Sequence, residues 1–279
     1  MENIADPELR NLIRKVHSRT GIDLGQYKDS YIARRLSTRM KVLGAMTYGS
    51  YARMLDAHAD EYDKVVDAFT INVSEFFRDR DAYRVIREKV IPAIVADKVS
   101  TGRRSLRVWS AGCACGEEVY SISMILHDVL GKEYDRFAIR LYATDIDDAI
   151  MKRAQEGLYD PVSLKNVEKS FLERFTKATP DGKIAVNDTV KRNVTFRHYD
   201  LINGGPFGGY FDLILCRNVM IYFSEPQKKK LIGHFFDALN PGGYLVIGKT
   251  ETLTADTRAA FIPAYGLERI YRKPERSLV

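Results

Sequence analysis

The sequence is short of cysteine, of long apolar runs and of any leader pattern. Three cysteines in 279 residues are too few, and odd in number, for a disulfide framework, so they favour a reducing compartment. No run approaches the roughly 18 apolar residues that a membrane-spanning helix needs. The first residues, Met1 to Asp6, lack the basic and apolar parts of a signal peptide. We therefore expect a cytoplasmic protein without membrane insertion.

Metal chemistry is not expected either. Cys113 and Cys115 form a C-x-C pair, but no second pair of His or Cys stands at the spacing of a metal site. Hydrophobic content of 45% and charged content of 29% are typical of a globular protein. The formal net charge of +6 favours acidic partners. Composition alone does not choose among nucleic acid, an acidic membrane face and an acidic protein.

The first part of the chain predicts a small helical bundle. Asp6-Pro7-Glu8 is a typical helix start, and Gly21 ends that helix. A second helix is expected over 28–43, and a longer one over 79–97 is expected to bridge the bundle to a second domain.

From Leu106 onward, predicted strands and helices alternate. The strands are 106–111, 139–145, 193–199, 211–216 and 243–249, with an antiparallel pair within 261–272. Such alternation predicts an α/β fold with a mainly parallel sheet.

A segment over about 159–192 breaks this alternation. A helix followed by a hairpin around Pro180-Asp181-Gly182 predicts a small antiparallel insert. We expect three parts: a helical domain over 1–78, a bridging helix and linker over 79–104, and an α/β domain over 105–279.

The segment from Val108 to Glu118 predicts a nucleoside site. It reads as a buried strand, a loop of small residues and a helix start, and the next strand ends at Asp145. The loop lets a ligand approach the backbone, and the acid accepts hydrogen bonds from ribose hydroxyls. The spacing of Gly112 and Gly116 is closer to the E/D-x-G-x-G-x-G loop of S-adenosylmethionine (SAM) methyltransferases than to a dinucleotide loop. Ser110 stands where that loop usually has its acid.

Polar residues follow two other predicted strands. Arg217 and Asn218 come after 211–216, and Asp200 comes after 193–199. Ligands of open α/β sheets lie outside these strand ends, although each residue could instead make a structural hydrogen bond or ion pair. The Asn/Asp-Pro-Pro-Tyr/Phe loop typical of nucleobase amino-methylation is absent.

The second helix carries a basic arc. Lys41 and Arg34 lie opposite its apolar stripe, and Arg35 and Arg39 lie beside the stripe. Such a run is commonly a solvated face. The alternative is a docking face for an acidic helix or for phosphates.

Three motifs together resemble the CheR-type chemotaxis receptor methyltransferases: N-V-S-E-F-F-R at 72–78, G-E-E-V-Y-S at 116–121 and C-R-N-V-M-I-Y-F at 216–223. The resemblance covers nearly the whole chain. It implies a class I, Rossmann-like SAM domain with a small antiparallel insert, preceded by an all-α bundle. It also implies methyl transfer from SAM to glutamate side chains of chemoreceptors, with glutamate methyl esters and S-adenosylhomocysteine as products.

The resemblance also implies the site residues. Arg78 would hold a carboxylate and Tyr222 would shape the transfer channel, while Arg35, Arg39 and Lys41 would dock the receptor. A glutamate carboxylate is already ionised at neutral pH, so we expect an in-line SN2 displacement without a general base. The implied cofactor-binding residues are Asn72, Ser74, Arg78, Gly112, Glu118, Asp145, Asp200, Leu201, Arg217 and Asn218.

Two rival interpretations stay open at this point. One is a nucleic-acid methyltransferase, and the other is a SAM-sensing scaffold without activity, which the degenerate glycine loop permits. The hairpin turn over 179–182 is short, so we expect no tether for a receptor C-terminal peptide. We expect a monomer that binds cytoplasmic helices of chemoreceptors and does not bind nucleic acid.

Overall fold

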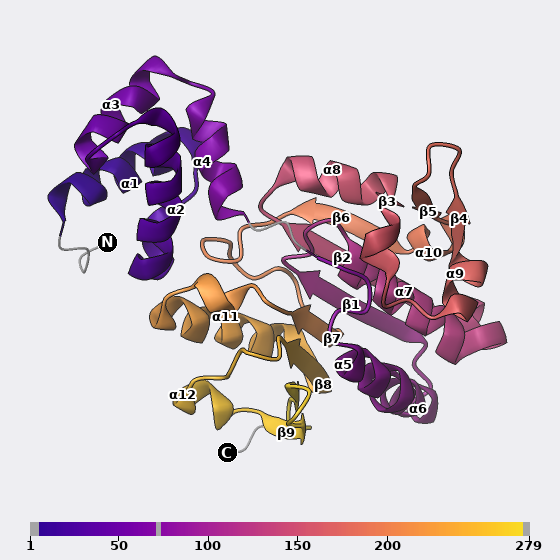
Figure 1. Cartoon of the computed structure of the whole chain (residues 1–279). Coiled ribbons are helices and arrows are strands. Elements are labelled where there is room, and N and C mark those ends of the chain that lie inside the picture. Colours follow the sequence, from indigo (N-terminus) through magenta and orange to yellow (C-terminus); the bar gives the residue numbers. More distant parts are fainter. Residues whose placement is uncertain (1–5, 71–73, 276–279) are drawn as a thin grey trace. The chain divides into compact units, whose positions relative to one another are not determined.

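The computed structural model describes residues 6–70 and 74–275 (Figure 1). The chain divides into two compact units, one of residues 1–71 with 222–228 and one of residues 72–221 with 229–279. The sequence placed the end of the helical domain later, at Arg78. Within the described residues, we find no helix with the length and apolar character that crossing a membrane requires.

The first unit is helical, as predicted. The Asp6 carboxylate caps its first helix by accepting from the backbone N–H groups of Glu8 and Leu9, and Gly21 ends that helix at φ 77°. Leu12 of the first helix is fully buried in the core of the unit. The elements within 6–70 are α1 (Pro7–Thr20), the 3-10 helix η1 (Leu24–Gln26), α2 (Asp29–Leu43), α3 (Tyr48–Ala57) and α4 (Glu61–Phe69).

The predicted bridging helix begins the second unit and is continuous but not uniform. It consists of α5 (Arg80–Val85), a π-helical turn η2 (Ile86–Val90) and α6 (Ile91–Ser100). In the π turn the Ile91 N–H bonds to the Ile86 carbonyl. Pro92 follows this turn and has no N–H to continue the ordinary ladder, which accounts for the local widening.

A seven-stranded sheet organises the second unit, in the order β6-β2-β1-β7-β8-β10-β9. β1 lies parallel to both β2 and β7, and β10 is antiparallel to its two neighbours. The chain order reverses between β1 and β7, which is where α/β sheets bind ligands. The strands are β1 (Ser105–Ala111), β2 (Ala138–Asp145), β6 (Val194–His198), β7 (Phe211–Cys216), β8 (Leu239–Ile247), β9 (Ile262–Tyr265) and β10 (Ile270–Arg272).

The helices of the α/β part alternate with these strands, as predicted (Figure 1). They are α7 (Glu117–Leu130), the 3-10 helix η3 (Gly131–Arg136), α8 (Asp148–Glu156), the 3-10 turn η5 (Met220–Tyr222), α11 (Glu225–Ala238) and α12 (Ala255–Arg258). The end of η5 and the start of α11, residues 222–228, group with the first unit.

β8 begins earlier than the sequence indicated. Residues 240–243, at and before the expected strand start at Gly243, form a bulge within the strand, because the pairing with β7 jumps from Phe211↔Leu239 to Leu213↔Tyr244. Gly242 has φ 76°, so it supplies the backbone conformation that the bulge needs.

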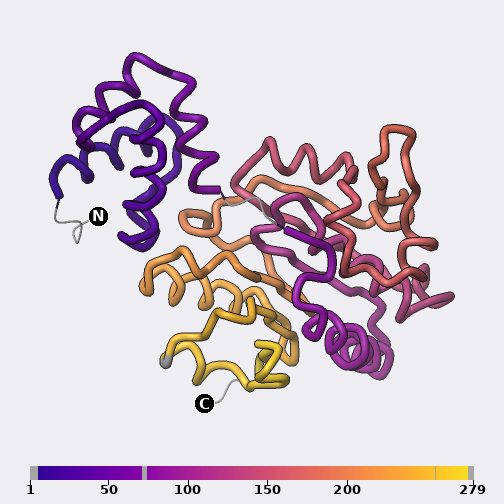
Figure 2. Tube along the Cα trace, viewed as in Figure 1, coloured from indigo at the N-terminus to yellow at the C-terminus, as the bar shows by residue number. Residues whose placement is uncertain are grey.

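The insert forms a separate three-stranded antiparallel sheet in the order β3-β5-β4, as predicted. Its hairpin is visible as a closed loop in the trace (Figure 2). The predicted helix is shorter than expected and is preceded by a 3-10 turn that begins at Pro161. The elements are β3 (Leu158–Tyr159), η4 (Pro161–Leu164), α9 (Lys169–Phe175), β4 (Thr176–Ala178), β5 (Ile184–Val186) and α10 (Asp188–Lys191).

Candidate functional site

The glycine loop joins β1 to α7 at the switch point of the sheet. Gly112 and Gly116 have φ values of 80° and 88°, which a residue with a side chain rarely adopts. The N–H of Gly112 donates to the Thr144 carbonyl at 2.8 Å, so the loop folds against the end of β2. A Cβ on Gly112 would lie 2.6 Å from Val219 Cγ2. Glycine is therefore needed here for the conformation and for the close approach.

Asp145 ends β2 and holds the same loop from the other side. Its Oδ2 accepts from the Ala114 N–H at 2.9 Å, and its Oδ1 accepts from the Asp147 N–H at 3.2 Å. Burial raises the pKa of this carboxyl, and the backbone N–H groups oppose that rise. The structure thus places an acid beside the glycine loop, at the position predicted to contact a ribose.

Glu118, the second residue of α7, lies beneath the loop and is buried. Its Oε1 accepts from the Ser110 hydroxyl at 2.8 Å, and its Oε2 lies 3.7 Å from Arg217 Nη1. Burial raises the pKa of Glu118, and Arg217 opposes this rise. Ser110 and Glu118 together therefore supply a buried polar pair at the end of β1.

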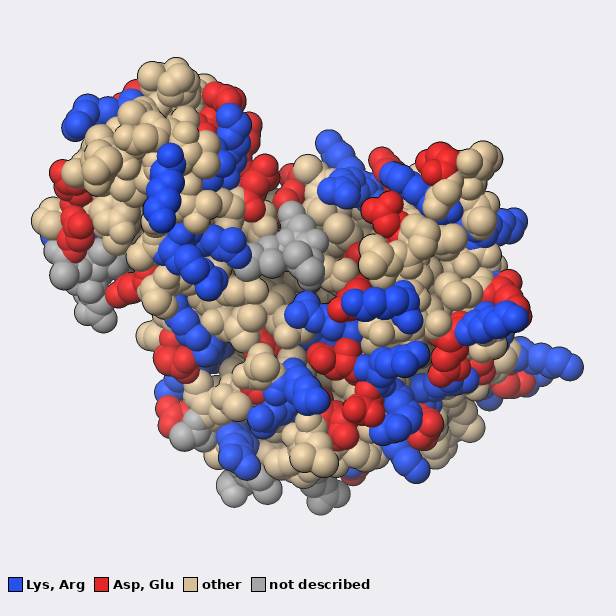
Figure 3. Space-filling model, in the orientation of Figure 1, with Lys and Arg blue, Asp and Glu red and all other residues tan. Residues whose placement is uncertain are grey.

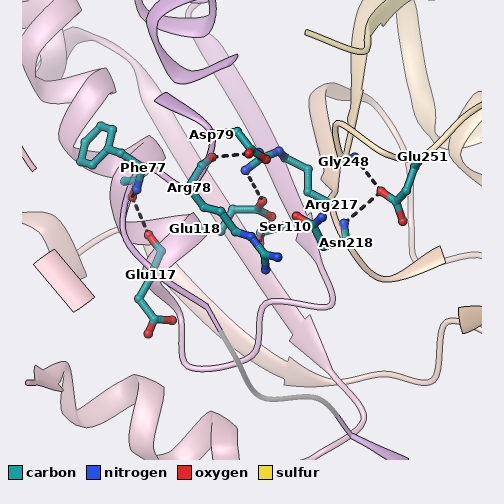
Figure 4. Close-up of polar contacts among 11 residues, drawn as sticks. Phe77, Arg78, Asp79, Ser110, Glu117, Glu118, Arg217, Asn218, Gly248 and Glu251 are labelled. Atoms are coloured by element: carbon teal, nitrogen blue, oxygen red, sulfur yellow. Dashed lines mark hydrogen bonds and ion pairs between the residues drawn. The ribbon is translucent and has the colours of Figure 1, made fainter. Parts of the chain in front are cut away.

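Arg217 follows β7 and connects several parts of the site (Figure 4). Its Nη2 donates to the Arg78 carbonyl at 2.8 Å and to Asp79 Oδ2 at 2.7 Å. Its guanidinium carbon lies 5.1 Å from the centre of the Tyr83 ring. The Arg217 side chain is only 3% exposed, so it fixes the segment of Arg78 against the ends of the sheet.

Backbone strain is concentrated around these contacts. Six non-glycine residues have positive φ in the part of the chain that the structure describes. Four of them, Phe77, Asp79, Ala114 and Asn218, belong to the loops just described. Such conformations cost energy and persist where the surroundings enforce them, which is typical of ligand sites.

Two residues that the sequence did not single out complete the site. Glu251 accepts backbone hydrogen bonds from Gly248 and Asn218, at 2.6 and 2.9 Å. Glu117 is buried beside Ser74, whose hydroxyl opposes the rise that burial causes in the Glu117 pKa. The one sequence signal for Glu117 is its place directly before Glu118 in the motif at 116–121.

Buried polar atoms without a hydrogen-bond partner remain in this region. With partners counted among residues 6–70 and 74–275, they are Tyr83 Oη, Glu117 Oε2, Arg217 Nε and Asn218 Oδ1. Buried polar atoms are nearly always paired, so unpaired ones in a loop cluster indicate a site for a polar ligand.

Other predicted cofactor residues are less informative. Asn72 lies outside the described residues. Asp200 uses its own carboxylate in a local turn, accepting from the N–H groups of Ile202 and Asn203 at 2.7 and 3.1 Å. Leu201 beside it is buried. These contacts shape the loop after β6, and the roles of Asp200 and Leu201 in cofactor binding stay predictions.

The predicted catalytic residue Tyr222 belongs to the helical unit. Its ring packs on Tyr31 with centroids 4.7 Å apart, and its carbonyl accepts from the Lys28 N–H at 3.0 Å. Its proposed role in shaping a transfer channel stays a prediction.

The predicted docking residues differ in their surroundings. Arg39 donates twice to Glu61, at 2.9 and 2.8 Å, and Glu61 is 1% exposed. Arg39, with a side chain that is 19% exposed, is therefore engaged within the helical unit, and its docking role stays a prediction. Arg35 is half-buried with its guanidinium carbon 5.2 Å from the centre of the Tyr31 ring, whereas Lys41 is exposed.

Several Lys and Arg side chains lie on the face of the helical unit that Figure 3 shows. At the end of α2, exposed apolar residues accompany Lys41: Val42 is 64% exposed and Met46 is 90% exposed.

Comparison with known proteins decides the family. The model of the CheR methyltransferase SAM binding domain matches residues 72–265, and that of the CheR methyltransferase all-alpha domain matches residues 7–70. This chain belongs to the CheR methyltransferase family. It is therefore an enzyme with a SAM-binding domain of class I architecture and an all-α domain before it.

Curated relatives match over most of their length. A chemotaxis protein methyltransferase from Borreliella burgdorferi is 32% identical, over 93% of this chain and 93% of the relative. One from Vibrio parahaemolyticus is 33% identical, over 91% and 92%. One from Listeria monocytogenes is 35% identical, over 86% and 88%. Among solved structures, a TehB-like SAM-dependent methyltransferase from Corynebacterium glutamicum is similar. The match covers 66% of this chain and 94% of that chain, with 14% sequence identity and a TM-score of 0.36.

The donor set fits SAM. Its methionine end carries an ammonium and a carboxylate, and the site offers the buried acid of Glu118 and the cation of Arg217. Its ribose needs an acceptor, and Asp145 lies beside the glycine loop. The unpaired atoms of Glu117 and Asn218 offer further polar contacts.

Proposed function

We propose that this protein transfers the methyl group of SAM to glutamate side chains on the cytoplasmic helices of chemoreceptors. The products are glutamate methyl esters and S-adenosylhomocysteine. The observation that carries the proposal is the match of both domains, over about nine tenths of each chain, to proteins named as chemotaxis protein methyltransferases.

The chemistry needs little acid–base work. SAM supplies a methyl group that its sulfonium already activates. A glutamate acceptor is ionised at neutral pH and has no proton to lose. The protein's task is then to position the two reactants in line and to balance their charges.

Arg78 is proposed to hold a carboxylate, of the substrate or of the cofactor. Its carbonyl is fixed by Arg217, and its side chain is half-buried in the cluster drawn in Figure 4. A cation here would offset the charge of an approaching anion, which otherwise opposes its entry into a site with buried acids such as Glu118.

The helical unit is proposed to dock the receptor through the exposed end of α2. Lys41 is exposed there, and Arg34 is exposed about two turns earlier on the same helix, next to the half-buried Arg35. The cations suit an acidic helix, and exposed Val42 and Met46 add apolar contact area. The proposal for this face does not rest on Arg39, because Glu61 engages it.

The decisive experiment identifies the acceptor. The protein is incubated with methyl-labelled SAM and a receptor cytoplasmic fragment, and the label is then tested with alkali. Glutamate methyl esters release the label as methanol, so alkali-labile label on the fragment is expected. Alkali-stable label on added RNA would support a nucleic-acid methyltransferase instead. SAM binding without any transfer would support a sensing scaffold.

Arg78 is tested by Arg78→Ala and Arg78→Lys in the same assay. The alanine variant is expected to lose at least about 100-fold in turnover, and the lysine variant to keep part of it because the charge remains. Near-normal turnover of Arg78→Ala would remove this residue from the proposed mechanism.

A further inference from the structure

Glu251 lies just after β8 and its carboxylate is only 4% exposed. Its Oε2 accepts from the N–H groups of Gly248 and Asn218, at 2.6 and 2.9 Å (Figure 4). Its Oε1 accepts from the N–H of Ile221 at 3.1 Å. One buried anion therefore binds backbone groups from the ends of two neighbouring strands.

The surroundings are shaped around this anion. A Cβ on Gly248 would lie 2.7 Å from Glu251 Oε2 and 2.8 Å from the backbone nitrogen of Asn218, so only glycine leaves the space. Asn218 has φ 61°, a conformation that is uncommon for any residue with a side chain. The carboxylate bonds to the N–H of this residue.

The residues held in this way are those of the cofactor site. Asn218 directly follows Arg217, whose side chain reaches Glu118, Asp79 and the Arg78 carbonyl. The loop from Asn218 to Ile221 makes none of the ladder bonds of β7, so its N–H groups need another acceptor. Glu251 is that acceptor.

We propose that Glu251 is a positioning residue for SAM binding: it fixes the backbone after β7 so that Arg217 and Asn218 are held ready for the methionine end of the cofactor. It touches neither reactant. The proposal rests on SAM binding and not on the identity of the methyl acceptor, so its failure would leave the glutamate proposal standing.

The chain offers a matched control at the opposite end of β7. Asp212 is also a buried carboxylate, and it accepts from the Arg107 N–H at 2.9 Å, from Asn240 Nδ2 at 2.6 Å and from Lys98 Nζ at 2.6 Å. It lies near the start of β7, whereas Glu251 binds the loop beyond the end of β7. A role limited to stability predicts the same behaviour for both carboxylates.

The test compares Glu251→Gln, Gly248→Ala and Asp212→Asn by calorimetric titration with SAM and with S-adenosylhomocysteine. Glutamine keeps the shape of Glu251 but loses the charge and presents an NH₂ group to backbone donors. We expect the Kd for both ligands to rise about tenfold or more in Glu251→Gln, the worth of one hydrogen bond to a charged group. Gly248→Ala disturbs the same contact without changing charge, and we expect a rise in the same direction. Asp212→Asn is expected to melt earlier but to keep its Kd within about twofold, because it is remote from the site.

A readout without ligand separates positioning from general stability. Hydrogen exchange of the amides of Asn218, Ile221 and Gly248 should accelerate in Glu251→Gln and stay unchanged in Asp212→Asn, measured well below both melting temperatures. If Glu251→Gln does not fold, Gly248→Ala carries the test alone. Wild-type Kd values in the folded Glu251 or Gly248 variant would overturn the proposal, as would an equal loss of affinity in Asp212→Asn.

Discussion

Replacing Arg217 with methionine should lower the free energy of unfolding by about 3–5 kcal/mol. Methionine fills a similar volume with apolar atoms, so packing changes little. It removes, however, the cation that lies 3.7 Å from the buried carboxylate of Glu118. It also removes the donor of the bonds to the Arg78 carbonyl and to Asp79.

These losses are unequal in size. Asp79 has a side chain that is 33% exposed, so water can replace its partner at little cost. Glu118 is 9% exposed and cannot be hydrated in the same way. Most of the penalty therefore comes from Glu118. The double variant Arg217→Met/Glu118→Gln should have a free energy of unfolding only about 1–2 kcal/mol below that of the wild type, because no unpaired charge is left buried.

The penalty should also depend on pH. Burial already raises the pKa of Glu118, and without Arg217 the hydrogen bond from the Ser110 hydroxyl is left to oppose that rise while the charge of Glu251 adds to it. A carboxyl whose pKa is higher in the folded state than in the unfolded state binds more protons when folded. Its penalty is then absent below the unfolded pKa and grows as pH rises to the folded pKa. Arg217→Met should accordingly lose less stability in mild acid than at neutral pH.

Urea denaturation of the wild type, both single variants and the double variant at two pH values measures these quantities. A loss below about 1 kcal/mol for Arg217→Met would refute the reasoning. So would a double variant no more stable than Arg217→Met, because Glu118 would then not be the source of the penalty.

Three further outcomes are expected. Arg39→Met should cost about 3 kcal/mol in urea denaturation, because the buried carboxylate of Glu61 loses its bidentate cation and keeps the Tyr51 hydroxyl at 2.8 Å and Lys64 Nζ at 3.9 Å. The Kd for SAM should not change, and an unchanged denaturation curve would contradict the structural role of the pair. Gly112→Ala should raise the calorimetric Kd for SAM about tenfold or more. Gly112→Ala/Val219→Ala should recover only part of the lost affinity, because the positive φ remains unfavourable. Wild-type affinity in the single variant would contradict this. Lys41→Glu should slow receptor methylation severalfold at low salt and much less at high salt, and a salt-independent difference would exclude electrostatic docking.

Much of the fold can be predicted from local signals in the sequence. Asp6 and Gly21 bound α1 through their own side chain and backbone, so their effects do not depend on distant residues. The glycine loop and Asp145 were predicted together because the β1-α7-β2 unit is continuous in sequence and its geometry is fixed by the fold class. The order of the seven strands was not predicted, because it depends on pairing between strands that are far apart in the sequence.

What the sequence could not predict depends on partners far along the chain. Arg39, predicted as a docking residue, pairs with Glu61 of α4, and no local pattern in the sequence indicates this contact. Glu251 carries no local signal at all, since its role arises only where the ends of β7 and β8 come together. The early start of β8 has the same origin: the bulge at Gly242 is set by pairing with β7.

The departure of the glycine loop from its usual pattern has a physical explanation in the structure. Ser110 stands where an acid is common, and its hydroxyl donates to Glu118 at 2.8 Å. The negative charge is thereby moved from the end of β1 to the first turn of α7, where the helix N-terminus stabilises an anion. Burial disfavours that charge, and Arg217 counters the penalty from the opposite side. A site whose glycine loop lacks the usual acid can therefore still contain a carboxylate, provided that the first turn of the following helix supplies it. The degenerate loop is for this reason poor evidence for a scaffold that has lost its cofactor chemistry.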